Sequence, residues 1–330
     1  MIIAVDAMGG DKGPQVVVKG AVEAVKEFPS NVLLVGDERR IKKELSLYNY
    51  PVEKISIKSA KETIEMGETP VAALKKKKGS SIGVAIDLLK EEKADALVSA
   101  GNTGAVVAAA TLKLRLLPSI ERAGIAVVIP TLKEPSLLID VGANISPKPL
   151  HLLQYAIMVK VYSEEILGRV NPKVGLLNIG TEESKGTGFI KETFDFLKAE
   201  SSLNFIGYIE GHDVFSGEVD CVICDGFVGN IILKVSESLG EVTNLMLKRE
   251  LNRNIFAKIT SSLFKFSLGS FKKKLDYSEY GGAPLLGTQK VCIIAHGVSS
   301  SRAIKNAIRV AYEFVGHQIN KDISTALLKK

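Results

Sequence analysis

The chain has few cysteines and no long apolar run, and each shortage excludes a class of protein. No apolar run in the sequence reaches the ~18 residues that a membrane-spanning helix requires. The first residues contain no basic segment and turn polar by Asp6, so we expect no signal peptide. Three cysteines in 330 residues fit a reducing compartment better than a disulfide framework.

Two of the cysteines, Cys221 and Cys224, form a C-x-x-C pair that does not favour redox or zinc chemistry. The pair lies in a strand-like run, whereas redox motifs stand at the start of a helix. The sequence offers no second cysteine pair and no nearby histidine pair for zinc. We therefore expect buried structural cysteines and no bound metal. The net charge of +6 permits an acidic partner or an anionic surface but does not call for nucleic acid.

Short apolar runs alternate with helical patterns along most of the chain. A strand–helix–strand–helix order predicts an α/β protein, in which a parallel sheet carries helices on its faces. With 46% hydrophobic residues, the chain can bury a large core in one domain or in two smaller ones. We expect a single domain over residues 1–330.

Polar segments containing glycine follow six of the predicted strands. In a parallel sheet, ligands bind in loops beyond the carboxyl ends of the strands, and glycine lets backbone N–H groups turn toward an anion. We therefore expect one anion-binding cleft, although the glycine pair after the first strand is equally compatible with a plain tight turn. The candidate substrate-binding residues outside the central loop are Asp6, Gly9, Gly10, Asp11, Asn102, Thr103, Asp140, Asn144 and His296.

The loop at residues 179–188 is the richest of these segments, since it combines three glycines with hydroxyl, acidic and basic side chains. It follows a predicted strand and precedes a helical pattern, where an anion is favoured, but its spacing is not that of a Walker A loop. Lys185 adds a positive charge. An ordinary helix-capping surface loop is the alternative. The candidate substrate-binding residues here are Asn178, Gly180, Thr181, Glu182 and Ser184.

Two further segments have two interpretations each. Asn230 follows the strand that ends near Cys224, and its amide can cap the next helix or project above the sheet. The four lysines at residues 75–78 form either a solvated helix face or a docking site for phosphate or an acidic protein.

Residues 239–275 break the strand–helix alternation and predict an inserted αα-hairpin. Its second helix carries apolar residues among lysines, which fits either core packing or an interfacial helix that contacts a membrane. The candidate membrane-contact residues are Ile255, Phe256, Ile259, Leu263 and Phe266.

Seven segments spread over nearly the whole chain together resemble the bacterial PlsX family of phosphate acyltransferases. These are VDAMGGD, SAGNTGA, IDVGAN, NIGTEESKG, DGFVGN, YGGAPLLG and AHGVSS. The combination of NIGTEESKG and DGFVGN is the most specific. Two departures are small: His-Gly-Val-Ser-Ser replaces the expected His-Gly-Ser-Ser, and Arg122-Ala123 replaces the usual Arg-Pro.

The resemblance implies transfer of a long acyl chain from acyl carrier protein to inorganic phosphate. The acyl phosphate formed is consumed by a membrane glycerol-3-phosphate acyltransferase. The resemblance also implies a Rossmann-like α/β/α sandwich with a mostly parallel sheet, a homodimer, and a cytoplasmic protein in peripheral contact with the inner face of an anionic membrane. It assigns catalysis to Lys185 and Asn230, without a cofactor.

These two assignments are chemically reasonable, because phosphate is already a nucleophile and needs no catalytic triad. Lys185 supplies charge for the phosphate or the oxyanion, and Asn230 supplies a neutral amide donor. Rival interpretations are a phosphotransacetylase-like enzyme that uses coenzyme A thioesters and a non-catalytic membrane-associated scaffold for lipid enzymes. A nicotinamide dehydrogenase is disfavoured, because no G-x-G-x-x-G follows the first strand.

Overall fold

The computed structural model describes residues 1–251 and 281–328, and within them eleven strands form one sheet. The spatial order of the strands is β3 (Ile55–Ser59), β2 (Asn31–Gly36), β1 (Ile2–Asp6), β4 (Ala96–Ser99), β11 (Val291–Ile294), β10 (Ala283–Leu286), β5 (Gly124–Ile129), β6 (Ser136–Ile139), β9 (Cys221–Ile223), β7 (Lys173–Leu177) and β8 (Asn204–Ile209).

Neighbouring strands are parallel except at the middle of the sheet, where β11–β10, β10–β5 and β5–β6 are antiparallel. The strands β1, β2, β3, β4 and β11 therefore run in one direction, and β6, β7, β8 and β9 run in the opposite direction. The mostly parallel α/β sheet is confirmed. The strands of one half, however, end at one edge of the sheet, and the strands of the other half end at the opposite edge.

Helices cover both faces of the sheet. Successive side chains of a strand point to opposite faces, so a strand whose residues are all apolar must be covered on both sides. One core cluster holds Ile3 and Val5 of β1, and the other holds Ala4. The first face is covered by α1 (Gly13–Glu27), α2 (Glu38–Leu45), α6 (Pro149–Glu165), α7 (Gly188–Ala199), α11 (Ser301–Gly316) and α12 (Ile319–Leu328). The second is covered by α3 (Pro70–Lys76), α4 (Ser81–Lys90), α5 (Thr103–Ala109) and the start of α8 (Gly226–Leu251).

Shorter helical turns join some of these elements. They are η1 (Val52–Lys54), the π-helical turn η2 (Ala110–Leu114) and η3 (Asp213–Phe215). The resulting three-layer arrangement is the expected α/β/α sandwich. No helix in the described part of the chain has the length and apolarity that crossing a membrane would require.

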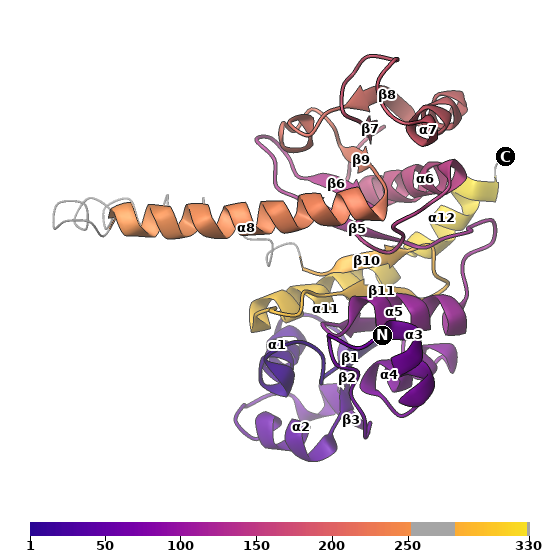
Figure 1. Ribbon diagram of the computed structural model, residues 1–330. Helices are drawn as coiled ribbons and strands as arrows, with labels where there is room; N and C mark the ends of the chain where they lie inside the picture. The colour runs from indigo at the N-terminus through magenta and orange to yellow at the C-terminus, as the bar shows by residue number, and fades with distance from the viewer. Residues whose placement is uncertain (252–280, 329–330) are drawn as a thin grey trace.

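The helix α8 crosses between the two halves of the sheet and then extends away from the rest of the chain (Figure 1). We expected a separate inserted helix to start near residue 239, whereas α8 is continuous from Gly226 to Leu251. No proline interrupts this stretch, so a helix started at Gly226 can propagate through it. Ile255, Phe256, Ile259, Leu263 and Phe266 lie outside the described residues, and the single domain with an inserted hairpin stays a prediction.

Candidate active site

The candidate residues fall into two groups of loops, because the two halves of the sheet run in opposite directions. The first group follows β1, β4 and β11, and it contains Asp6, Asn102 and His296. The second group follows β6, β9 and β7, and it contains Asp140, Asn230 and Lys185. We expected a single cleft at one edge of the sheet, and the strand directions do not support that simple arrangement.

Asp6, in the first group, is buried and holds the loops together. Its Oδ2 accepts a hydrogen bond of 2.8 Å from the Ser99 hydroxyl, and its Oδ1 accepts one of 3.2 Å from the Met8 N–H. Burial raises the pKa of this carboxyl above its ordinary value, although the hydrogen bonds oppose the rise. Asp6 therefore connects β1 to β4.

Gly9 and Gly10 allow the first loop to touch the other two loops of its group. A Cβ atom on Gly9 would lie 2.5 Å from the Gly101 nitrogen, and one on Gly10 would lie 2.8 Å from the Gly297 oxygen. Gly10 also has a φ of +84°, which favours glycine. The N–H of Asp11 donates to the Gly297 oxygen at 2.8 Å. The sequence could not distinguish a tight turn from a close approach, and the structure contains the close approach.

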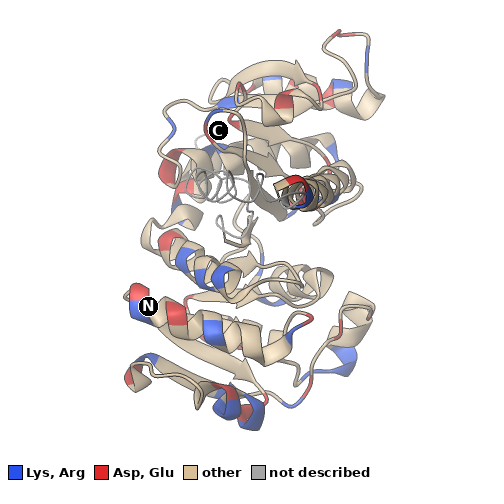
Figure 2. Ribbon diagram, turned by 90° about the vertical axis from the view of Figure 1, so that its left-hand side faces the viewer, with Lys and Arg blue, Asp and Glu red and all other residues tan. Residues whose placement is uncertain are grey.

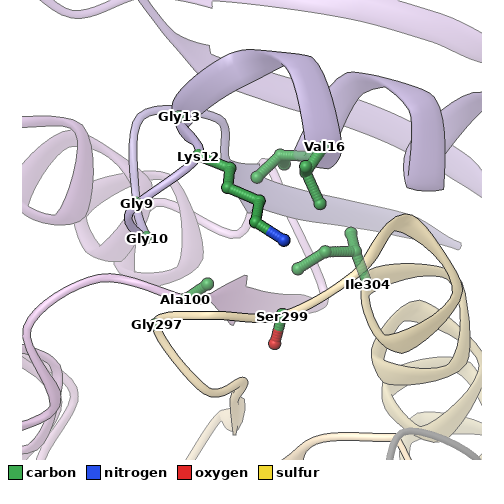
Figure 3. A pocket seen from close by; sticks show the side chains of 10 residues that line it. Gly9, Gly10, Lys12, Gly13, Val16, Ala100, Gly297, Ser299 and Ile304 are labelled. Carbon is green, nitrogen blue, oxygen red and sulfur yellow. The ribbon is translucent and has the colours of Figure 1, made fainter.

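A small pocket opens beside this contact, between the start of α1 and the start of α11. Figure 3 shows the Lys12 side chain extending between these two elements, toward Ser299 and Ile304. The walls of the pocket also include Gly9, Gly10, Ala100 and Gly297. Sequence reasoning did not single out Lys12, although the residue directly follows Asp11.

Asn102 has a structural role in the first group. Its Oδ1 accepts from the Ala105 N–H at 3.0 Å, which caps α5. Its Nδ2 donates to the backbone oxygens of Glu65, Met66 and Glu68 at 3.0–3.2 Å. The side chain thus joins α5 to the loop at residues 65–68. The adjacent Thr103, the first residue of α5, is half-buried.

In the second group, Asp140 is buried at the end of β6 and organises the turn that follows. Its Oδ1 accepts from the N–H groups of Ile125, Gly142 and Ala143 at 3.0–3.1 Å, and its Oδ2 accepts from the Asn144 N–H at 2.7 Å. Burial raises the pKa of Asp140, and these four donors oppose the rise by stabilising the charged form. Asp140 is therefore saturated with backbone donors.

Asn144 is also engaged with the protein. Its Nδ2 donates to the Ala123 oxygen and to the Tyr155 hydroxyl, both at 2.6 Å. Ala123 stands where the resembling family usually has proline. A proline would offer the same backbone oxygen, so this departure leaves the acceptor in place.

The central loop after β7 presents its polar side chains outward. Asn178 folds the loop back on itself by donating from Nδ2 to the Gly180 oxygen at 3.1 Å. The Lys185 N–H donates to the Glu182 oxygen at 3.0 Å, which makes a turn. Thr187 closes the loop by capping α7. The residues from Thr181 through Lys185, which include Ser184, are exposed, and the Lys185 side chain makes no hydrogen bond or ion pair with another described residue.

Asn230 lies in the first turns of α8, the helix that follows the neighbouring strand β9. Strands β9 and β7 pair through Ile223 and Leu176, so the loops carrying Asn230 and Lys185 leave adjacent strands at the same edge. The cap of α8 is Asp225, whose Oδ1 accepts from the N–H groups of Phe227 and Val228 at 2.9 Å. The Asn230 side chain is exposed and has no hydrogen bond to the described residues. The interpretation of Asn230 as a helix cap is therefore wrong.

The close approach of the turn after β6 to the start of α8 depends on two glycines. A Cβ atom on Gly229 would lie 1.9 Å from the Asp140 oxygen, and one on Gly226 would lie 2.5 Å from the Asn144 oxygen. A Cβ atom on Gly142 would stand 3.7 Å from the Cβ of Asn230. Asn230 is thus held directly above the turn that Asp140 organises.

A contact that sequence reasoning missed joins the two groups. Lys234, one helical turn after Asn230, places its Nζ 2.6 Å from His296 Nε2 and 3.0 Å from Glu237 Oε2. Lys234 and His296 stand 62 positions apart in the sequence, so no local pattern reveals this contact. The only signal in the sequence is the spacing of four residues between Asn230 and Lys234, which puts both on one face of a helix.

The remaining predictions concern the cysteines and the charged surface. Cys221 and Cys224 are buried as expected, and burial raises the pKa of the Cys221 thiol to about 12. Of the lysines at residues 75–78, Lys77 is half-buried and donates to the Glu68 carboxylate at 2.6 Å, whereas Lys75, Lys76 and Lys78 are exposed. Basic and acidic positions alternate along the coloured part of the ribbon in Figure 2.

Solved structures of several enzymes share this fold. A phosphotransacetylase from Streptococcus pyogenes superposes with a TM-score of 0.63 over 97% of this chain and 94% of that chain, at 16% identity. A branched-chain phosphotransacylase from Enterococcus faecalis V583 superposes with a TM-score of 0.56 over 96% of this chain and 99% of that chain, at 15% identity. At such low identity, the likeness concerns the fold alone.

Sequence comparisons are more specific. The model of the fatty acid synthesis protein family matches residues 1–322. A protein from Geotalea uraniireducens (strain Rf4) named phosphate acyltransferase is 49% identical over 99% of this chain and 94% of its own length. Another of that name from Dictyoglomus turgidum is 49% identical over 100% of this chain and 98% of its own length. The full-length matches, together with the loops described above, place this chain in the PlsX family of phosphate acyltransferases.

Proposed function

We propose that the protein transfers a long-chain acyl group from an acyl carrier protein thioester to inorganic phosphate, which yields acyl phosphate for phospholipid synthesis. The observation that carries this proposal is the placement of Lys185 and Asn230. Lys185 lies in the loop after β7, and Asn230 lies near the start of α8, the helix that follows the adjacent strand β9. Both are exposed, and neither side chain has a hydrogen-bond partner among the described residues. Their neighbours Asp140, Asn144 and Asn178 are engaged within the protein.

The chemistry requires charge and donors more than a base. A phosphate oxygen attacks the thioester carbonyl, the new C–O bond forms, and the C–S bond breaks as the carrier thiol leaves and takes a proton. Lys185 neutralises charge on phosphate or on the oxyanion, and the Asn230 amide donates to the developing oxyanion. The loop at residues 179–188 is exposed apart from the buried Gly180 and the half-buried Gly186, and its backbone N–H groups offer further donors for phosphate.

Two further partners belong to this proposal, a second copy of the chain and a membrane. The described part of α8 carries a stripe of apolar side chains that are 46–64% exposed: Phe227, Ile231, Val235, Leu239, Val242, Leu245 and Met246. An exposed stripe of this length supports a helix-mediated homodimer. Peripheral contact with the anionic inner face of the cell membrane would deliver the product to a membrane glycerol-3-phosphate acyltransferase.

A second candidate is a phosphotransacetylase-like activity on acyl coenzyme A, which the shared fold with the phosphotransacetylase from Streptococcus pyogenes favours. The transferred group and the acceptor would be unchanged, and only the carrier differs. Assaying carrier-protein and coenzyme A thioesters of equal chain length separates the two. A clear preference for the coenzyme A thioester would replace the carrier-protein proposal.

The deciding experiment incubates the purified protein with an acyl carrier protein thioester, with and without phosphate. We expect phosphate-dependent loss of thioester and stoichiometric acyl phosphate, trapped with hydroxylamine as the hydroxamate. Thioester loss that does not depend on phosphate would indicate a hydrolase. No thioester loss at all would favour a non-catalytic scaffold.

A further inference from the structure

We propose that Lys234 and Glu237 are positioning residues, which hold the His296 loop against α8 one helical turn beyond Asn230. We call the three side chains of Lys234, Glu237 and His296 the α8 latch. This inference rests on the proposed function, because its kinetic consequence is argued for acyl transfer to phosphate. Its geometry stands on the structure independently.

The latch consists of one acidic and two basic side chains at short distances. Lys234 Nζ lies 3.0 Å from Glu237 Oε2, and His296 Nε2 lies 3.4 Å from the same oxygen. The two basic nitrogens are 2.6 Å apart. On the other side of the imidazole ring, Nδ1 accepts the Val298 N–H at 3.3 Å, so the backbone of the loop helps to orient the ring.

The Glu237 carboxylate makes this arrangement favourable. Its side chain is only 19% exposed, against 51% for Lys234 and 31% for His296. Burial by itself raises the pKa of Glu237, but hydrogen bonds from His296 and Lys234 lower it overall, so the carboxylate is charged. Without the Glu237 carboxylate, Lys234 and His296 would lose the oxygen that both of them contact. Without Lys234, the Glu237–His296 pair would remain.

The latch matters because of what lies on each side of it. On α8, Lys234 is four residues from Asn230. On the other side, Gly297 accepts the Asp11 N–H at 2.8 Å, so the His296 loop is bound to the loop after β1. The latch therefore sets the position of the Asn230 helix relative to the first loop group. A displacement of about 1 Å in the position of a reacting side chain can lower the rate about 100-fold.

Kinetics of latch variants test this role. We expect Glu237→Gln to lower kcat by about 30-fold or more and Lys234→Ala by about tenfold, since only the first removes the carboxylate that both Lys234 and His296 contact. The KM for phosphate should stay within about threefold, because the groups proposed to hold phosphate lie in the second loop group alone. Lys234→Arg should recover most of the lost rate, since arginine keeps the charge and the donors.

The matched control is Lys42→Ala, which removes an equally charged side chain from an exposed pair with Glu38 (2.7 Å) on α2, a helix that belongs to neither loop group. Its kcat and KM should equal those of the wild type. Melting temperatures of all four variants should stay near the wild-type value. A Glu237→Gln variant that is folded and has wild-type kcat would overturn the proposal, and so would a rate loss that follows the loss of thermal stability.

A second measurement does not depend on activity. The chain has four histidines, so the His296 imidazole signal can be assigned in a proton–carbon NMR spectrum by its absence in His296→Gln. We expect Glu237→Gln and Lys234→Ala to shift this signal and Lys42→Ala to leave it in place. If the wild type made no acyl phosphate while the signal shifted, the proposed function would fail and the latch contact would stand. If the His296 signal shifted in neither latch variant, the contact between His296 and α8 would be refuted.

Discussion

The two loop groups use similar residues in opposite ways. In the first group, Asp6 and Asn102 point into the protein: Asp6 bonds to Ser99, and Asn102 bonds to four backbone groups. In the second group, Lys185 of the loop after β7 and Asn230 of α8 are exposed, and their side chains have no partner within residues 1–251 and 281–328. Polar side chains that have satisfied their hydrogen bonds internally stabilise the loops, whereas unsatisfied ones remain available to a ligand.

This difference also exists within the second group. Asp140 and Asn144 are engaged with backbone N–H groups, Ala123 and Tyr155, and they form the support on which Asn230 stands. A polar residue at a strand end is thus not by itself a ligand residue. The predictions below test this division between supporting and reacting residues, from the largest expected effect to the smallest.

Lys185→Ala should lower turnover at least ~100-fold and leave the melting temperature unchanged, because removal of one preorganised partner of a developing anion costs about 3 kcal/mol. The side chain makes no hydrogen bond or ion pair with another described residue, so we expect little loss of stability. Steady-state assays with thermal melting check both parts. Lys191→Ala, on the adjacent helix α7, is the control with equal charge change. Near-normal turnover in folded Lys185→Ala protein would refute the role.

Asn230→Ala should reduce turnover by roughly 30-fold or more, and Asn230→Asp should be no better, since a carboxylate repels an oxyanion that an amide stabilises. Asp225 already caps α8, so neither change removes the cap. Single-turnover measurements with saturating phosphate are the appropriate assay. An aspartate variant with good activity would show that Asn230 does not donate to the reacting group.

Asn102→Ala should show the opposite behaviour. It removes the cap of α5 and leaves three backbone oxygens near residues 65–68 without their donor, which we expect to cost about 2–3 kcal/mol of unfolding free energy. The turnover of the molecules that remain folded should change by less than about threefold. Chemical denaturation and active-site titration give the two numbers. A stable Asn102→Ala protein with strongly reduced turnover would show that Asn102 takes part in the reaction.

The lysine run should give the smallest effects. Because Lys75, Lys76 and Lys78 are exposed, changing them together to serine should raise KM for the carrier-protein thioester about threefold at low salt and flatten its salt dependence. Lys77→Ala should lower the melting temperature instead, since Lys77 bonds to Glu68 and to the Thr63 oxygen. A KM that is unchanged at every salt concentration would leave the three lysines as a solvated helix face.

Much of this protein was predictable because it depends on local sequence. Alternating apolar runs and helical patterns identify the strands β1, β4, β6, β7, β9 and β11 and the glycine-containing loops after them, since burial imposes these periods on any strand or helix. The segments around Lys185 and Asn230 indicate the PlsX family before any coordinates exist, and the family comparisons confirm it. The charge and donor chemistry of the two residues follows from their side chains alone.

What the local sequence did not contain was the direction of the strands. The strand β10 (Ala283–Leu286) is four residues long, contains Pro284 and lies between glycines, so its sequence does not indicate a strand. This strand and the β5–β6 hairpin reverse the sheet, which separates the loops into two groups. Strand pairing is decided by long-range packing, because a strand's own residues do not record which way its neighbour runs.

The division of roles among the polar residues was likewise decided by tertiary structure. Asp140 and Lys185 both follow strands and look equally available in the sequence. Only in the folded chain does one carboxylate meet four backbone N–H groups while the other side chain meets solvent. The contact between Lys234 and His296 exists because α8 crosses between the two halves of the sheet. The sequence by itself determined the residue types, the loops and the family. Three-dimensional packing decided which side chains are left free to react. The reason is that hydrogen-bond partners are set by proximity in space and not by proximity along the chain.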